Sequence, residues 1–261
     1  MTTPTVLEKI VKEKKIHVEE RRRRMPLTNH NLDRPSPPRG FAAALKAQRK
    51  LNQPSVIAEI KKGSPSKGVI RPEFDVAEIA SAYDRAGATC LSCLTDKPFF
   101  YGDDQDLMLA RQHSRVPVLR KDFIVDAYQI LESYQLGADC ILLIAAILDD
   151  DELSAFFDQA SALGMDALIE VHNAEECRRA LTLGPKLLGI NNRNLHDFSV
   201  SLTTTIDLLP FIPTETQVVT ESGIHTRDDV ELMLKAGVST FLVGEAFMRA
   251  PDPGEKLKAL F

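Results

Sequence analysis

The sequence is short of several residue types and patterns, and each shortage excludes a class of protein. Its 261 residues contain no tryptophan and no apolar run near the roughly 20 residues that span a bilayer, so we expect no membrane partner. The first residues lack the apolar core of a secretory signal peptide, which favours a cytoplasmic location. A net charge of −5 provides no general attraction to nucleic acid, so we expect no nucleic-acid partner either.

Cysteines and histidines are also few, and they are not arranged as metal ligands. Of the four cysteines, Cys90 and Cys93 lie three positions apart in a strand-like run and therefore on opposite faces of it. No second cysteine pair follows, and the six histidines show no metal-binding spacing. We expect buried reduced thiols, with no metal and no redox site.

What the sequence does contain is a repeat of a short apolar strand, a polar turn and an amphipathic helix. The eight predicted strands cover residues 56–61, 89–94, 116–121, 139–146, 166–171, 186–191, 216–221 and 240–245. No G-x-G-x-x-G follows any of them, which argues against a dinucleotide-binding open sheet. Eight such units in about 200 residues predict an α/β fold, a single (β/α)8 TIM barrel.

Helices between the strands are marked by a polar residue at the start and a glycine at the end. The clearest cover residues 75–88, 127–138, 150–165 and 226–238. Glycine after the last apolar residue suits the left-handed backbone that ends many helices. The positions of these glycines therefore support strand–helix alternation.

Residues 1–55 differ in character from the repeat. Residues 3–24 predict a charged amphipathic helix, and residues 37–48 predict a second short helix after a proline-rich link. The arginines at 21–24 follow two glutamates, which favours a solvated helix end over a polyanion site. We expect residues 1–55 to form a helical extension packed over one end of a barrel made by residues 56–261.

Polar side chains gather at the carboxyl ends of the predicted strands, where barrel enzymes carry their active sites. Glu59 and Lys61 lie two positions apart and share a face, and a loop rich in Lys, Gly and Ser follows them as an expected lid. Later strands end in Lys121, Glu170, Asn191 and Glu221. Because unpaired buried charge costs several kcal/mol, we expect these groups to pair. They suit acid–base chemistry, or a Schiff-base lysine, acting on a small anionic substrate.

Two turns near the end of the chain point to a phosphate group. Ser222 and Gly223 follow the seventh strand, and Gly244 and Glu245 follow the eighth and open a short helical turn. Loops after strands 7 and 8 often hold phosphate in these barrels, because glycine lets backbone N–H groups approach the anion. We therefore expect a phosphorylated small-molecule substrate.

Seven segments together resemble one enzyme family, that of indole-3-glycerol-phosphate synthase. In chain order they are AEIKKGSPSKG, LTDKPFFYG, LRKDFIVDAYQI, ALIEVHN, GINNRNL, TESGI and FLVGEAFM. The match extends over residues 56–250, and a helical N-terminal extension also fits the family. The resemblance implies a carboxy-lyase without cofactor or metal. It would convert 1-(2-carboxyphenylamino)-1-deoxyribulose 5-phosphate into indole-3-glycerol phosphate, CO₂ and water in tryptophan biosynthesis.

The resemblance also implies roles for individual residues. Lys121 would be the general acid of ring closure, Glu170 and Lys61 would serve the later dehydration, and the division of steps between the lysines stays open. Glu59 would orient and balance the lysines, while Asn191 and Glu221 would position the substrate. The expected substrate- and phosphate-binding residues are Ser64, Phe100, Arg193, Ser222, Gly223, Gly244 and Glu245.

The residues alone leave two other kinds of protein open. One is a different phosphosugar barrel enzyme. A phosphoribosylanthranilate isomerase would need a cysteine base near the first strand, and the strand segment VIAEIK has none. A class I aldolase would form a Schiff base through a lysine, which borohydride would trap. The other is a non-catalytic barrel used as a scaffold, although the full set of strand-end ionisable groups argues against it. We expect a monomer or a weak homodimer.

Overall fold

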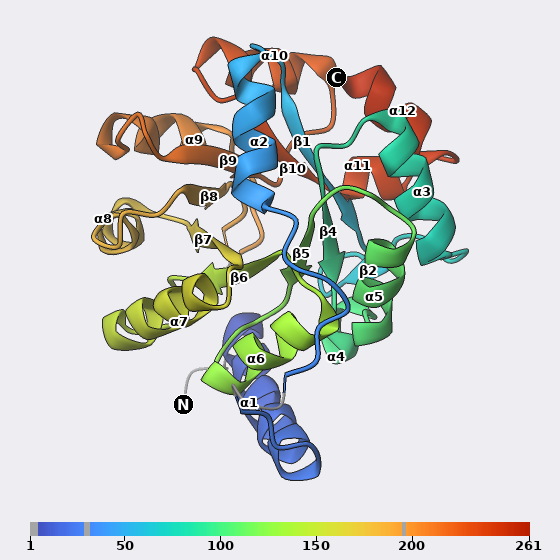
Figure 1. The fold of residues 1–261 in the computed structure, drawn as a ribbon. Coiled ribbons are helices and arrows are strands. Elements are labelled where there is room, and N and C mark those ends of the chain that lie inside the picture. Colours follow the sequence, from blue (N-terminus) through green and yellow to red (C-terminus); the bar gives the residue numbers. More distant parts are fainter. Residues whose placement is uncertain (1–4, 29–31, 195–196) are drawn as a thin grey trace.

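Eight parallel strands close into a barrel in the computed structural model, which describes residues 5–28, 32–194 and 197–261 (Figure 1). Each strand pairs with the next along the chain, and β1 closes the ring by pairing with β10 as well as with β4. The strands are β1 (Ser55–Ile60), β4 (Cys90–Leu94), β5 (Val118–Lys121), β6 (Cys140–Ile144), β7 (Asp166–Val171), β8 (Leu187–Asn191), β9 (Gln217–Glu221) and β10 (Thr240–Val243). The predicted (β/α)8 barrel is confirmed.

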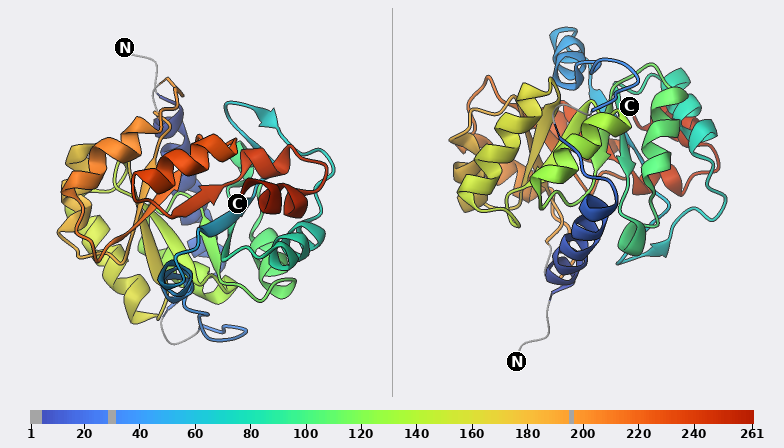
Figure 2. Two further views of the ribbon diagram at one scale, coloured as in Figure 1. Left: turned by 90° about the horizontal axis from the view of Figure 1, so that it is seen from above. Right: turned by 60° about the horizontal axis from the view of Figure 1, so that its bottom comes forward.

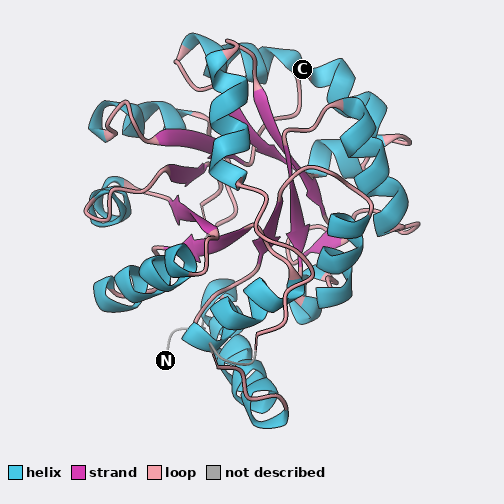
Figure 3. Ribbon diagram, in the orientation of Figure 1, coloured by secondary structure: helices cyan, strands magenta, loops and turns pink. Residues whose placement is uncertain are grey.

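Helices surround the strands on the outside of the barrel, as Figure 3 shows. Polar residues and glycines cap these helices as expected. In α3, for example, the Asp75 side chain accepts the N–H of Glu78, and Gly87 ends the helix with a left-handed backbone. The outer helices are α3 (Val76–Ala86), α4 (Lys97–Phe100), α5 (Asp104–Gln112), α6 (Ala127–Leu136), α7 (Asp150–Ala162), α8 (Ala174–Leu181), α9 (Thr203–Leu208) with the 3₁₀ turn η1 (Leu209–Phe211), α10 (Arg227–Lys235), α11 (Glu245–Met248) and α12 (Pro253–Leu260).

The segment after β1 has more regular structure than its sequence predicted. It forms a small antiparallel hairpin of β2 (Gly63–Ser64) and β3 (Gly68–Val69). A side chain at Gly63 would come within 2.7 Å of the Tyr101 ring, so this hairpin packs closely on the end of α4. Glycine allows that approach.

Apolar side chains form one layer inside the barrel and another between the strands and the helices. Cys90 belongs to the inner layer and Cys93 to the outer layer, as their spacing predicted, and both are buried free thiols. The inner layer also contains Phe41 and Leu45, which are fully buried although they precede the first strand.

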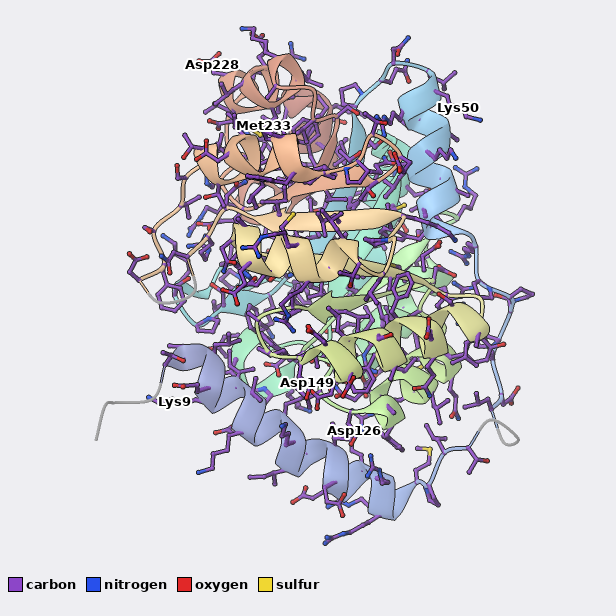
Figure 4. The ribbon with its side chains drawn as sticks, turned by 90° about the vertical axis from the view of Figure 1, so that its left-hand side faces the viewer. Lys9, Lys50, Asp126, Asp149, Asp228 and Met233 are labelled. Carbon is purple, nitrogen blue, oxygen red and sulfur yellow. The ribbon has the colours of Figure 1, made fainter. Side chains whose placement is uncertain are left out.

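These two residues belong to α2 (Phe41–Lys50), which closes the amino-terminal end of the barrel. The N–H of Ala42 donates to Asp166 at the start of β7, and the Leu45 carbonyl accepts the hydroxyl of Ser55 at the start of β1. Three apolar residues of α1 (Val6–Arg24), by contrast, line a pocket among the carboxyl ends of the strands. Figures 2 and 4 show the two helices on opposite sides of the barrel.

The extension therefore contacts both ends of the barrel, and the prediction that it covers one end was wrong. The reason is physical: the open inner layer needs an apolar plug, which α2 supplies through Phe41 and Leu45. The division into residues 1–55 and 56–261 stays a prediction; within it, residues 1–4 and 29–31 lie outside the described part, as do residues 195–196 of the barrel. In the described part, no helix has the length and apolar character needed to cross a bilayer.

Helix α1 is held at its end of the barrel by ion pairs. The ammonium of Lys14 lies 2.7 Å from carboxylate oxygens of both Asp96 and Asp122, and all three side chains are at most 8% exposed. Further along the helix, Arg22 pairs with Asp126, which Figure 4 labels beside α1. Asp122 directly follows Lys121, so α1 is tied to the strand that carries this lysine.

The buried carboxylate of Asp139 is one centre that holds the link between α1 and α2. Its Oδ1 atom accepts hydrogen bonds from the Arg39 N–H at 2.8 Å, the Arg34 guanidinium at 3.2 Å and the Arg111 guanidinium at 2.6 Å. Its Oδ2 atom accepts the N–H of Val118. Asp139 thereby joins the link to α5 and β5.

Replacing Asp139 with Asn should lower the free energy of unfolding by roughly 3 kcal/mol, because it leaves buried guanidinium groups without their counter-ion. Urea unfolding followed by circular dichroism measures the change. The control is Asp150→Asn: Asp150 also pairs with an arginine, Arg179, but is 77% exposed, so a change within about 0.5 kcal/mol is expected. Equal midpoints for the two variants would contradict a role for Asp139 in holding the link.

Candidate active site

One pocket at the carboxyl ends of the strands brings together all of the site residues expected from the sequence. Five of the first six lie in strands β1, β5, β7, β8 and β9, and the sixth, Lys61, directly follows β1; the turns and short helices after the strands supply the others. They are Glu59, Lys61, Lys121, Glu170, Asn191 and Glu221, with Ser64, Phe100, Arg193, Ser222, Gly223, Gly244 and Glu245. Val6, Leu7 and Ile10 of α1 line the same pocket, and sequence reasoning did not assign them to the site.

The charged groups of the pocket are paired, as their expected burial required. The ammonium of Lys61 lies 2.5 Å from Glu59 Oε2. The ammonium of Lys121 lies 3.4 Å from Glu170 Oε2 and 3.7 Å from Glu221 Oε2. These carboxylates are at most 5% exposed and the two lysines are 17% exposed, so the lysines are the groups that a small molecule reaches more readily.

The pairing shifts the pKa values of the buried groups in different directions. Burial alone would lower the pKa of Lys121, but Glu170, Glu221 and Glu59 outweigh it and raise that pKa, so the ammonium keeps its proton. Burial likewise opposes ionisation of Glu170, but Lys121 and His172 lower its pKa well below the usual range. Burial and the repulsion of Glu170 raise the pKa of Glu221 to about 8. The pocket thus holds a proton donor, an ionised carboxylate and a second carboxyl group whose pKa is raised toward neutrality.

Two glycines provide the space that two of the carboxylates occupy. A Cβ atom on Gly244 would lie 2.2 Å from Glu59 Oε2, and a Cβ atom on Gly189 would lie 2.3 Å from Glu221 Oε1. Real carbon–oxygen contacts are never this short, so any side chain at these positions would displace a carboxylate. Gly244 therefore has a steric role beside Glu59 in addition to the backbone role predicted for it.

The turn after β9 is ordered around Asn191. Ser222 and Gly223 have φ values of +64° and +87°, which place two successive residues in the left-handed region. The Ser222 hydroxyl donates to Asn191 Oδ1 at 2.9 Å, and the Arg193 N–H donates to the same atom at 3.1 Å. Asn191 in turn donates to Glu170 Oε1 at 3.3 Å, so both ends of its amide contact the protein.

Glu245 lies at the start of α11, in the part of the pocket expected to hold phosphate. Its carboxylate accepts the Arg249 guanidinium at 2.9 Å and lies 4.0 Å from that of Arg193. Burial opposes its ionisation, but the hydrogen bond from Arg249 and the nearby lysines Lys67 and Lys61 lower its pKa. Glu245 is therefore ionised and faces cations that a phosphate group would also attract.

Apolar residues form another wall of the pocket. The ring of Phe100, at the end of α4, lies 5.9 Å from that of Phe123 with the planes tilted by 40°. Leu94, Leu142, Ile144 and Leu242 continue this wall around the strand ends. The pocket therefore offers an aromatic surface on one side and glycine-rich turns on the other.

His172 is a charged neighbour of the site that sequence reasoning missed. It follows β7, and its ring lies 3.2 Å from Glu170 and 3.0 Å from Glu176. Burial would lower the pKa of His172, but the two nearby carboxylates raise it to about 10. The signal was present in the sequence: His172 lies two positions after Glu170, the same spacing that placed Glu59 and Lys61 on one face.

In a comparison with protein families, residues 7–260, nearly the whole chain, match the model of indole-3-glycerol phosphate synthase. The chain belongs to this family. As an indole-3-glycerol phosphate synthase family member it is a carboxy-lyase of tryptophan biosynthesis, and its substrate is a phosphorylated small molecule. The match sets aside the isomerase, the aldolase and the non-catalytic barrel.

Solved structures of other proteins share the barrel at low sequence identity. A thiamine phosphate pyrophosphorylase from Pyrococcus furiosus is 19% identical with a TM-score of 0.58, over 79% of this chain and 93% of that chain. An N-acetylmannosamine-6-phosphate 2-epimerase from Clostridium perfringens is 16% identical with a TM-score of 0.57, over 74% of this chain and 86% of that chain. At these identities the likeness concerns the fold alone.

Replacing Gly244 with Ala should lower kcat by about tenfold, because the new methyl group displaces Glu59 from Lys61 in the synthase pocket. Steady-state kinetics and thermal unfolding are measured together. The control is Gly184→Ala, where a Cβ meets no described atom within 4 Å but a φ of +58° makes alanine unfavourable by about 1 kcal/mol. The control should lose stability and keep kcat; the reverse pattern would contradict the steric role of Gly244.

Proposed function

We propose that Lys121 is the general acid that protonates the substrate carbonyl during ring closure. In the family reaction an aromatic carbon attacks this carbonyl, and the developing negative charge on the oxygen requires a proton. The observation that carries the proposal is the position of the Lys121 ammonium, which lines the pocket and is held protonated chiefly by Glu170. A Schiff-base role is less well supported, because it needs the neutral amine.

We further propose that Glu170 and Lys61 serve the dehydration that follows decarboxylation. Loss of water needs one group that takes a proton from the cyclised intermediate and one that gives a proton to the leaving oxygen. The ionised carboxylate of Glu170 suits the first task. Lys61 suits the second, and its contact with Glu59 orients it and balances its charge.

Glu221 and Asn191 complete the polar floor as positioning groups. Burial and Glu170 raise the pKa of Glu221 to about 8, so its carboxyl group can carry a proton near neutral pH and donate a hydrogen bond to the substrate. The amide of Asn191 already binds Glu170, Ser222 and the Arg193 backbone. We therefore propose that Asn191 positions the substrate largely by fixing these neighbours.

The two ends of the pocket suit the two ends of the substrate. We propose that the anthranilate ring packs on Phe100, where Phe123 supports it. The phosphate would bind at the glycine-containing turns at the other end, where backbone N–H groups and a cation converge. The residues proposed for this end are Ser64, Arg193, Ser222, Gly223, Gly244 and Glu245. A cytoplasmic location and a monomer or weak homodimer also remain proposals.

Replacing Lys121 with Met should lower kcat by about 10²-fold or more, since methionine keeps the length of the side chain but has no proton to give. The assay supplies 1-(2-carboxyphenylamino)-1-deoxyribulose 5-phosphate and follows indole fluorescence, to which a chain without tryptophan adds little background. Lys186→Met is the control, because Lys186 is 77% exposed and pairs with Asp166 at the far end of the barrel. Near-normal turnover by Lys121→Met would remove the proposed role.

Replacing Glu245 with Gln should lower KM by about threefold, because it removes a negative charge beside the proposed phosphate position. The difference should shrink as salt is added, since ions screen the repulsion. Glu255→Gln is the control: Glu255 lies on α12, is 68% exposed and pairs with Lys258. A rise in KM would instead show that the Glu245 carboxylate assists binding, for example by orienting Arg193.

A further inference from the structure

A chain of three ionisable side chains runs from the pocket into the helix behind it. Glu170 ends β7, His172 follows it, and Glu176 lies in the first turn of α8. The His172 ring contacts Glu170 Oε1 through Nε2 at 3.2 Å and Glu176 Oε2 through Nδ1 at 3.0 Å. His172 is 11% exposed and does not line the pocket, so it meets substrate only through Glu170.

Glu176 is itself held firmly, which makes it a fixed anchor for the imidazole. Its Oε2 accepts the backbone N–H of His172 at 2.8 Å in addition to the ring nitrogen, and its Oε1 accepts the amide of Asn173 at 2.6 Å. Asn173 caps α8 by accepting two backbone N–H groups of the first turn. The anchor is thus part of the helix start and has little freedom to move.

The two oxygens of Glu170 have different surroundings. Oε1 contacts the His172 ring and accepts the Asn191 amide at 3.3 Å. Oε2 lies 3.4 Å from the Lys121 ammonium and accepts no hydrogen bond from the described residues. His172 and Asn191 therefore surround Oε1, whereas Oε2 is buried beside the Lys121 ammonium.

We propose that His172 is a positioning residue for this synthase: as an imidazolium fixed by Glu176, it holds Glu170 Oε1 and leaves Oε2 to exchange a proton with the substrate. This rests on the acid–base role proposed above for Glu170. A carboxylate that rotates freely would present either oxygen at varying distances, and misplacement of a reacting group by about 1 Å can cost 10²-fold in rate. Asn191 holds Glu170 Oε1 by a neutral hydrogen bond, and His172 adds a positive charge beside the same oxygen.

The imidazole of His172 stays protonated at neutral pH, because the two carboxylates that it contacts raise its pKa. The titratable groups that face it are Glu170 from β7 and Glu176 from α8, and beyond Glu170 lie Lys121 from β5 and Glu221 from β9. Its pKa rises from 6.5 to about 10 on folding, so its contribution to stability is full below about pH 6.5 and is lost as the pH rises through 10.

The first test replaces His172 with Gln, which reaches Glu170 with a neutral hydrogen-bond donor. We expect kcat to fall about tenfold while KM stays within about threefold, because the substrate is not touched. Loss of the neighbouring cation raises the pKa of Glu170, so the acidic limb of the kcat–pH profile should move to higher pH. His172→Lys, which restores a positive charge, should return the limb toward its wild-type position.

The second test uses two neighbouring glutamates of α8. Glu176→Gln removes the anchor charge and should lower the pKa of His172, read from the imidazole NMR signals, and reduce kcat. Glu175→Gln is the matched control, because Glu175 lies in the same turn and contributes only its backbone N–H to the cap. The control should match wild type in kcat and in the His172 titration.

Three outcomes would overturn the inference. A His172→Gln enzyme with wild-type kcat and pH profile is one. A loss of kcat with an unmoved acidic limb, which indicates structural support alone, is the second. The third is an equal effect of Glu175→Gln and Glu176→Gln. Glu170→Gln in the same assay separates the two proposals. Normal turnover by the Glu170→Gln enzyme rejects the role of Glu170. A loss of turnover in Glu170→Gln with normal turnover in His172→Gln rejects the role of His172 only.

Discussion

The ammonium of Lys121 lies between two carboxylates in a place that water barely reaches, and the rest of the site is arranged around this contact. Buried charges are tolerated only when they are matched. Glu170 balances Lys121 and Glu59 balances Lys61, and the pKa of Glu221 is raised because a further charged carboxylate would face Glu170. The glycines at 189 and 244 follow from the same requirement, since a side chain at either would push a carboxylate out of place. The lysines of the pocket therefore have their counter-ions in place before substrate enters.

Most of the barrel could be predicted because its signals are local. Apolar runs, helix caps and terminal glycines located all eight strands to within about two residues of their observed bounds. The elements that were missed depend on long-range contacts. Nothing near Phe41 indicates that it fills the inside of a barrel whose strands come later, and nothing near Gly63 indicates that the ring of Tyr101 supports a hairpin there.

The candidate site was also largely predictable, because strand ends of a closed parallel barrel meet at one mouth. Knowing the fold therefore placed Glu59 and Glu221 in one pocket although 162 positions separate them. The direction of the pKa shift of Lys121 was not predictable, since it depends on how three carboxylates and burial balance in space. His172 was overlooked because its charge and position depend on its contact with Glu176. The position of Glu176 depends in turn on where α8 starts.

The opposite placements of α1 and α2 affect the order in which the chain acquires structure. Both helices leave the ribosome before any strand, yet Ala42 bonds to Asp166, 124 positions later, and Lys14 needs Asp96 and Asp122. The last strand, β10, must also return to β1 before the ring is closed. Contacts over such distances form slowly, because long loops must be ordered first. The segment with α1 and α2 is thus synthesised before the strands that bury it, and its apolar residues stay exposed until those strands form.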